Sequence, residues 1–477
     1  MKARLRRPAA LLAGSLIPLS LLIGPPASAA PAAPLTDAFA DAATTYEVPR
    51  DLLVALAYAE THLDDHHGAP SASGGYGVMH LVSNPTTHTL EQAAQLTATP
   101  IDTLKTDTTA NITGGAAILR AHADKLGLDA TTRKDPGKWY TAIAKYGNAS
   151  SPDVARLYAD TVYDLLAKGV NTAAPSGTVT VPPQPVQPDR GPYAQARDLN
   201  TPHLAAAVDY PGAKWVAASS SNYTVSNRPT SNAIDRIVIH VTQGSYAGTI
   251  SWFQNPAAQV SAHYVVRSSD GDVTQMVREK DRAWHARDWN SRSVGIEHEG
   301  YVNDASWFTD AMYRSSAALT RNIADRYGIP KDRAHIVGHV EVPGNDHTDP
   351  GPNWDWTRYM QYVNGGGGGN PHTPQSICGA GYETVDSAAL GTAGTVYLLY
   401  NNSNGYNCVT TIKRSSVGTA TPTTAYLEVQ GGTRVTDSGN FAYYAGPVRA
   451  PAAGKCVKWG GKAGSFSYDS PFGHCGS

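Results

Sequence analysis

The chain of 477 residues has few cysteines, almost no net charge and few long apolar segments. Its four cysteines all lie in the last hundred residues, which excludes cysteine-based metal sites and disulfides from the rest of the chain. Lysine and arginine total 38 against 40 acidic residues, and such a balance argues against a basic surface that grips nucleic acid. Hydrophobic residues make up 41% of the chain, which is enough for cores and too little for a polytopic membrane protein. We therefore expect neither a nucleic-acid nor a membrane partner.

The N-terminus has the features of a secretory signal peptide. Four basic residues among the first seven precede an apolar stretch from about Leu11 to Ile23, and an A-x-A site follows at residues 27–29. A membrane anchor is the alternative, but it needs about 20 uninterrupted apolar residues, and Pro18 and Pro25 interrupt this stretch. We predict that residues 1–29 are removed and that the mature protein is secreted into an oxidising environment.

Length and composition predict about three domains in a multidomain α+β protein. Residues 35–172 show apolar residues at helical spacing and are expected to form a helical domain, followed by a proline-rich linker over 175–209. Residues 210–364 mix strand-like and helical runs, which predicts an α/β domain with a mixed sheet. A glycine-rich linker, 365–375, then leads to residues 376–477, where strand-like runs alternate with turn residues and predict an all-β domain.

Histidines and an aspartate in the second block form a candidate zinc site. His240 follows the apolar run Ile237-Val238-Ile239, and His339, His347 and Asp349 come nearly a hundred residues later. Two imidazoles with one carboxylate or a third imidazole leave a fourth zinc position open, which is the pattern of a catalytic site. The spacing leaves open whether His347 or Asp349 is the third ligand.

Residues 210–364 resemble the type-2 N-acetylmuramoyl-L-alanine amidases, whose domain is shared with the peptidoglycan recognition proteins. The resemblance rests on six motifs in order: Ile239-His240-Val241-Thr242, Ser261-Ala262-His263-Tyr264, Ala283-Trp284-His285-Ala286, Ser293 to Gly300, Gly338-His339 and Asp349-Pro350-Gly351-Pro352. It implies a central mixed sheet flanked by helices, with a Zn²⁺ ion in a cleft on one face.

The resemblance also implies roles for individual residues. His240, His339 and Asp349 would be the zinc ligands, because the ten-residue offset from His339 to Asp349 fits the family register. Glu297 would orient or deprotonate the attacking water and then protonate the leaving amine. His347 stands where related enzymes often carry a lysine, and we hypothesise that it donates a hydrogen bond to the developing oxyanion.

Other residues of this block are candidates for substrate contacts. His285 and Trp284 occupy family positions that line the substrate cleft, although a structural hydrogen bond is the alternative for His285. Trp252, Trp289 and Trp307 could line a groove for sugar and peptide, although tryptophans in a small domain are more often part of the core.

The first block resembles the lysozyme-like lytic transglycosylases over about 120 residues. The similarity lies in four segments: Val48 to His62, Gly75 to Leu81, Asn111 to Ala116 and Ala142 to Gly147. Carried over, Glu60 would be the general acid and base at a glycosidic bond, a role that needs a raised pKa. Thr61 and His80 replace the serine and glutamine that are usual there. The alternative is a helical wall-binding or packing domain in which Glu60 ends a helix.

The last block contains all four cysteines and resembles the small secreted domain of spore-associated proteins. The similarity lies in residues 378–382, 445–448 and 454–461. Four cysteines allow three pairings, and chain order favours Cys378–Cys408 with Cys456–Cys475. A zinc site is the alternative, but the block has no C-x-x-C pair.

Taken together, the motifs predict a monomeric, secreted or cell-wall-associated zinc amidase. It would cleave the amide between N-acetylmuramic acid and L-alanine in bacterial peptidoglycan. One alternative is a protein that binds peptidoglycan without cutting it, and the complete set of His240, His339 and Asp349 argues against this. A second alternative is a bifunctional enzyme that also cuts the glycan strand with Glu60.

Overall fold

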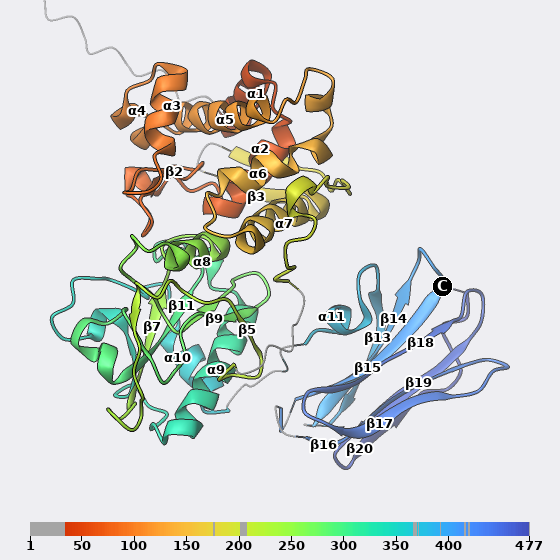
Figure 1. Ribbon diagram of the computed structural model, residues 1–477. Coiled ribbons are helices and arrows are strands. Elements are labelled where there is room, and N and C mark those ends of the chain that lie inside the picture. Colours follow the sequence, from red (N-terminus) through yellow and green to blue (C-terminus); the bar gives the residue numbers. More distant parts are fainter. Residues whose placement is uncertain are drawn as a thin grey trace, which may run out of the picture.

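The computed structural model describes residues 34–174, 177–200, 208–365, 370, 372–391, 393–414, 416–417 and 420–476 (Figure 1). The predicted signal peptide, residues 1–29, lies outside this range. Within the range, no helix combines the length and apolar character needed to cross a membrane.

The first block is helical and is built around one buried helix. Helix α2, Arg50–Thr61, buries Leu52, Leu53, Val54 and Leu56 completely, because its apolar residues occur on all sides rather than on one stripe. The other helices of the block are α1 (Leu35–Tyr46), α3 (Thr89–Thr97), α4 (Ile101–Thr106), α5 (Thr108–Lys125), α6 (Tyr140–Tyr146) and α7 (Pro152–Lys168), of which α1 and α7 pack directly on α2. The short strands β1 (Gly75–Tyr76) and β2 (Leu81–Val82) pair in the connection between α2 and α3.

The proline-rich segment after α7 packs on the helical block over most of its described length. Strands β3 (Val170–Ala174) and β4 (Gly177–Val181) form a hairpin, and Arg50 donates to the carbonyl oxygen of Thr180 in it. Farther along, Arg190 forms an ion pair with Asp160 of α7 at 3.0 Å. These residues therefore extend the helical block instead of standing clear of it.

The second block is built on a six-stranded mixed sheet. Its strand order is β12 (Ile336–Gly338), β7 (Arg236–Val241), β11 (Ser293–His298), β8 (Tyr264–Val266), β9 (Val273–Gln275) and β5 (Ala213–Trp215). Strands β12, β7, β11 and β8 run parallel to one another. Strand β9 is antiparallel to β8, and β5 is parallel to β9. Two further short strands, β6 (Tyr223–Thr224) and β10 (Arg282–Ala283), pair with each other. The expectation of a mixed sheet flanked by helices is confirmed for this block.

The two faces of this sheet are covered differently. Helices α9 (Asp310–Tyr327) and α10 (Trp356–Val363) pack with Ile237 and Ile239 of β7 on one face. The other face carries helix α8 (Tyr246–Gln254), and Figure 1 shows α8 between the sheet and the helical block. Ile250 and Phe253 of α8 belong to the same apolar cluster as the core of the helical block. One apolar cluster therefore spans the first two blocks, in addition to the separate core between the sheet and α9.

Polar and aromatic contacts reinforce the joint, which is the contact region between the helical block and the second block. The ring of His62, which follows α2, stacks on Trp307 with centroids 3.5 Å apart and on Tyr58 at 4.5 Å. The backbone N–H of Ala72 donates to the carbonyl oxygen of Gln243 at 3.1 Å. These contacts join segments far apart in the chain, and they fix the helical block against the sheet.

The third block consists of two four-stranded antiparallel sheets that share a core. One sheet contains β13 (Glu383–Leu390), β14 (Gly394–Asn401), β15 (Tyr406–Lys413) and β18 (Tyr444–Pro451); the other contains β17 (Val435–Phe441), β16 (Thr421–Val429), β19 (Val457–Ala463) and β20 (Phe466–Asp469). A short helix, α11 (Pro374–Cys378), precedes them. The structure pairs Cys378 with Cys408 and Cys456 with Cys475, which confirms the pairing that chain order favours.

The stacked position of His62 makes the stability of the joint depend on pH. Burial lowers the pKa of His62 to about 4, partly opposed by the charge of Asp304, whereas an unfolded histidine titrates near 6.5. The unfolded state thus binds the proton first, so the stabilisation by neutral His62 is complete above about pH 6.5 and is lost as the pH falls toward 4. We expect the thermal unfolding midpoint to fall more between pH 7.5 and pH 5 in the wild type than in His62→Asn.

The control for this measurement is His67→Asn. His67 has the same left-handed φ of 52° as His62, but its side chain is fully exposed. Asparagine tolerates that backbone conformation at both positions. The wild type and His67→Asn should share one pH dependence, and an equal slope in His62→Asn would contradict the assignment.

Candidate functional site

A cavity of about 700 Å³ lies on the face of the sheet opposite α9 and α10. Its lining includes His240, Glu297, His339 and Asp349 from the second block, and also Ala72, Ser73 and His80 from the helical block. All three residues expected to bind metal and the expected general base therefore line one cavity. The helical block contributes part of the wall, which the sequence motifs do not indicate.

The parallel strands place these side chains at one edge of the sheet. His240 near the end of β7 lies directly beside Glu297 of β11 in the parallel register. Neighbouring residues in register point to the same face of a sheet, and alternate residues point to opposite faces. Ile239 and Ile296 accordingly face the α9 core, whereas His240 and Glu297 face the cavity. His339 follows directly after β12, the neighbour of β7 on its other side.

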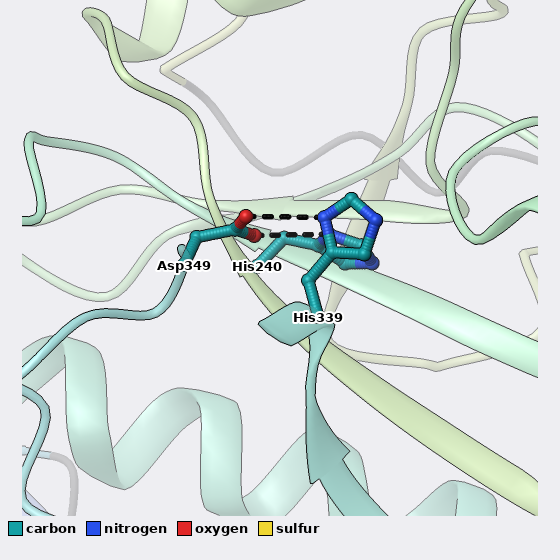
Figure 2. Close-up of side chains that lie close together, drawn as sticks. All are labelled: His240, His339 and Asp349. Atoms are coloured by element: carbon teal, nitrogen blue, oxygen red, sulfur yellow. Dashed lines mark hydrogen bonds and ion pairs between the residues drawn. The ribbon is translucent and has the colours of Figure 1, made fainter. Parts of the chain in front are cut away.

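His240, His339 and Asp349 form a buried triad, drawn in Figure 2. One oxygen of Asp349 lies 3.2 Å from Nδ1 of His240, and the other lies 3.1 Å from Nδ1 of His339. One candidate ligand atom from each residue lies within 4.8 Å of the others. Two imidazoles and one carboxylate at this spacing match the donor set of a catalytic zinc site.

The protonation states favoured at the triad are those a metal requires. Burial lowers the pKa of His240 to about 4, so its imidazole is neutral at neutral pH. Burial opposes the charge of Asp349, but hydrogen bonds and charges from His240 and His339 hold the pKa of its carboxyl below the ordinary value. A neutral imidazole and an ionised carboxylate are the forms that bind zinc.

His285 lines the cavity as expected, and it also holds a triad residue in place. Its Nδ1 lies 2.9 Å from Nε2 of His240, the ring nitrogen that does not face Asp349. Asn290 fixes this loop by accepting hydrogen bonds from the backbone N–H groups of His285 and Ala286. A metal-bound histidine commonly uses its second nitrogen in such a contact, which fixes the orientation of the ring. His285 therefore has a positioning role beside its place in the wall.

Glu297 carries a buried oxygen that points into the site without a donor. Among the described residues, none donates a hydrogen bond to Oε2 of Glu297. Burial, and next the charge of Asp349, raise the pKa of the Glu297 carboxyl well above its ordinary value. Glu299, two residues on, instead accepts hydrogen bonds from the backbone N–H groups of Tyr246 and Ser268. Glu297 thus presents an unpartnered oxygen at the cavity, whereas both oxygens of Glu299 accept backbone hydrogen bonds.

His347 lies at the rim of the triad. Its side chain is 60% exposed, its ring stacks on His339 with centroids 4.4 Å apart, and its Nδ1 lies 3.9 Å from Asp349. The metal-ligand geometry groups Asp349, and not His347, with the two buried histidines. This arrangement agrees with Asp349 as the third ligand and leaves His347 free to reach toward a substrate.

The remaining expected residues divide between the cavity wall and the core. Trp284 lines the cavity, and its indole N–H donates to Thr224. Trp252 of α8 also lines the cavity, whereas Trp307 is buried in the joint against His62. Trp289 lies near the guanidinium groups of Arg236 and Arg292. Of the three tryptophans considered for a groove, only Trp252 is in the wall.

Glu60 lies in a second cavity, of about 400 Å³, at the end of α2. Its carboxyl is buried, with Oε1 accepting a hydrogen bond from the hydroxyl of Tyr158 at 2.5 Å. Oε2 accepts one from the hydroxyl of Ser245 at 3.1 Å and lies 3.6 Å from Nδ1 of His80. Ser245 belongs to the second block, so Glu60 is bound from both sides of the joint. Sequence reasoning missed Ser245, because no motif links it to a residue 185 positions away.

Comparisons with known proteins agree on the second block. A family model described as N-acetylmuramoyl-L-alanine amidase matches residues 230–352. N-acetylmuramoyl-L-alanine amidase A of Achromobacter lyticus is 44% identical over 182 residues, covering 35% of this chain and 100% of that protein. The 1,6-anhydro-N-acetylmuramyl-L-alanine amidase AmpD of Escherichia coli is 39% identical over 113 residues, covering 22% and 59%.

The chain is also similar to Spore-associated protein A of Streptomyces coelicolor. The two are 42% identical over 102 residues, which cover 21% of this chain and 66% of that protein.

The triad geometry predicts a graded set of metal affinities. We expect His339→Ala and Asp349→Ala to weaken zinc binding by more than about 100-fold, since each removes a ligand. His285→Ala should weaken it by roughly 10- to 100-fold, the usual cost of losing a residue that orients a ligand. His347→Ala should leave it unchanged. Calorimetric titration of the metal-free protein measures all four, and loss of binding in His347→Ala would make His347 a ligand.

Proposed function

Because the chain belongs to the N-acetylmuramoyl-L-alanine amidases, we propose that it is a zinc-dependent hydrolase of the amide between N-acetylmuramic acid and L-alanine in peptidoglycan. The observation that carries the zinc dependence is the buried triad beside the unpartnered oxygen of Glu297. Zinc bound by His240, His339 and Asp349 would supply Lewis acidity that lowers the pKa of a water molecule and polarises the amide carbonyl.

Glu297 moves the protons in the proposed reaction. Its carboxylate accepts a proton from the water molecule as the water oxygen forms a bond to the amide carbonyl carbon. It then gives that proton to the amide nitrogen as the C–N bond breaks. The products are a carboxylate on the lactyl group of the sugar and a free amine on the L-alanine of the stem peptide. The raised pKa of Glu297 suits a group that must hold the proton between the two steps.

In the proposed reaction, His347 stabilises the negative charge that develops on the carbonyl oxygen. Its ring is exposed at the rim of the cavity and is steadied by stacking on His339. A hydrogen bond that forms only as charge develops lowers the barrier without tightening substrate binding. His285 and Trp284 complete the wall on this side of the substrate.

We also propose that the protein acts outside the cell as a monomer, on the wall itself. The basic and apolar N-terminal residues, the A-x-A site and two disulfides support secretion. The third block, with its similarity to a spore-associated protein, would then be an additional secreted module.

Amide hydrolysis should depend on zinc and on Glu297 separately. We expect release of new amino termini from purified cell wall to stop with a chelator and to return with added zinc. Glu297→Gln should lower kcat by roughly 10²- to 10⁴-fold, because it removes the proton acceptor. His347→Ala should lower kcat by roughly 10²- to 10³-fold.

The control in each case is the zinc content of the variant, which should equal that of the wild type. Amino-terminus release that survives complete chelation would refute zinc dependence. Full activity in Glu297→Gln would remove that residue from the mechanism while leaving the metal site intact.

A second activity, cleavage of the glycan strand by Glu60, is supported by one observation. The Glu60 carboxyl is buried and lines a cavity of its own. A general acid must lie beside the bond that it protonates, and burial favours its protonated form. The hydroxyl groups of Tyr158 and Ser245 would orient it.

This activity predicts new reducing or anhydro sugar ends in wall treated with the wild type. Glu60→Gln should lower their rate of appearance by at least about 100-fold. The glutamine keeps the size of the side chain, so amino-terminus release reports whether the variant is folded. Equal numbers of sugar ends from both proteins would reject the second activity.

A further inference from the structure

The triad cavity and the Glu60 cavity share a wall. Four residues line both of them: Ser73 and His80 of the helical block, and Gly248 and Trp252 of α8. The cavities are therefore neighbours across the joint, with Trp252 between them. A substrate longer than one sugar unit at the triad would meet this boundary.

The joint holds the two cavities in a fixed relation. The backbone N–H of Ser150 donates to the hydroxyl of Ser251, and the hydroxyl of Ser151 donates to the side chain of Gln254. Asn255 donates to the hydroxyl of Thr86 at 2.6 Å. These contacts surround the Glu60 cavity, and the shared apolar core lies behind them. The arrangement is that of one site built from two blocks.

The lining of the Glu60 cavity is chemically suited to sugars. Beside Glu60, His80 and the aromatic rings of Tyr146, Tyr158 and Trp252, it contains many hydroxyl and amide side chains: Ser73, Asn84, Thr86, Thr87, Asn148, Ser150, Ser251 and Asn255. Such groups both donate and accept hydrogen bonds, as sugar hydroxyl and N-acetyl groups do. The cavity lining contains no lysine or arginine.

The triad cavity differs in having an arginine in its lining. Arg287 and its ion-pair partner Asp346 line the triad cavity and not the Glu60 cavity. An arginine is suited to the carboxylate groups of a stem peptide, and hydroxyl and amide side chains are suited to a glycan. The scissile amide joins the glycan to the stem peptide, and each of these two parts of the substrate thus finds suitable lining residues in a different cavity.

We propose that the helical block and the amidase block form one composite substrate groove. The glycan strand continues from the sugar at the triad, past Trp252, into the Glu60 cavity, while the stem peptide remains in the triad cavity. The proposal rests on the amidase function proposed above and extends it. The helical block would then make the amidase prefer polymeric glycan over a single muramoyl-peptide.

The test compares kcat/KM for amino-terminus release from a muramoyl-peptide monosaccharide and from a tetrasaccharide carrying the same peptide. The wild type should favour the tetrasaccharide by about tenfold, the equivalent of one or two good sugar–aromatic and hydrogen-bond contacts. Thr87→Trp, which fills the Glu60 cavity, and Trp252→Ala, which removes the shared ring, should each bring this ratio close to one. Thr103→Trp is the matched control, because Thr103 is exposed on α4 and lines neither cavity.

The possible outcomes distinguish failure of the composite groove from failure of the proposed amidase function. An equal kcat/KM for the two substrates in the wild type, or an unchanged ratio in both cavity variants, would overturn the composite groove alone. No release from either substrate by the zinc-loaded wild type would overturn the amidase function and the groove together. A ratio that falls in the cavity variants and persists in Thr103→Trp would establish the groove.

Discussion

Parallel pairing of β12, β7 and β11 is the constraint on which the site depends. It brings His240 and Glu297 into register and sets His339 at the adjacent strand end, although about a hundred residues separate the first from the last. A slip of one residue in β7 would turn His240 toward α9 and put Ile239 in the cavity. The apolar residues that alternate with the functional ones prevent this slip, since Ile237 and Ile239 are completely buried against that helix. The packing of the core therefore determines that His240 and Glu297 face the cavity.

Compensation of buried charge is the second organising feature. Asp349 is buried between two imidazoles, and Glu60 is buried between hydroxyl groups from two blocks. A buried carboxylate is costly without such partners. At the triad a metal ion would satisfy that requirement, whereas at Glu60 hydroxyl groups do so. A buried carboxylate thus has different partners in the two neighbouring cavities.

The sequence predicts the residues of the candidate metal site, because the motifs consist of residues close in the chain or in strands with clear patterns. It also predicts the mixed sheet of the second block and the all-β character of the third, which consists of β13 to β20 after the short helix α11. It does not predict the joint. Ser245 and Ser73 acquire their roles from packing between distant segments, and nothing local distinguishes them from other serines. His285 was expected in the wall, but its contact with His240 depends on a loop geometry that spacing does not give.

The shared core of the first two blocks has a consequence for how such proteins diversify. Cutting the chain between them would expose the face formed by Ile250 and Phe253, and large exposed apolar patches promote aggregation. In this chain, separating the two blocks would therefore require that this face be covered or replaced by polar residues. The β-rich block is different, because its hydrophobic clusters contain no described residue before Cys378. It buries its apolar residues within itself, so its gain or loss would expose no such face.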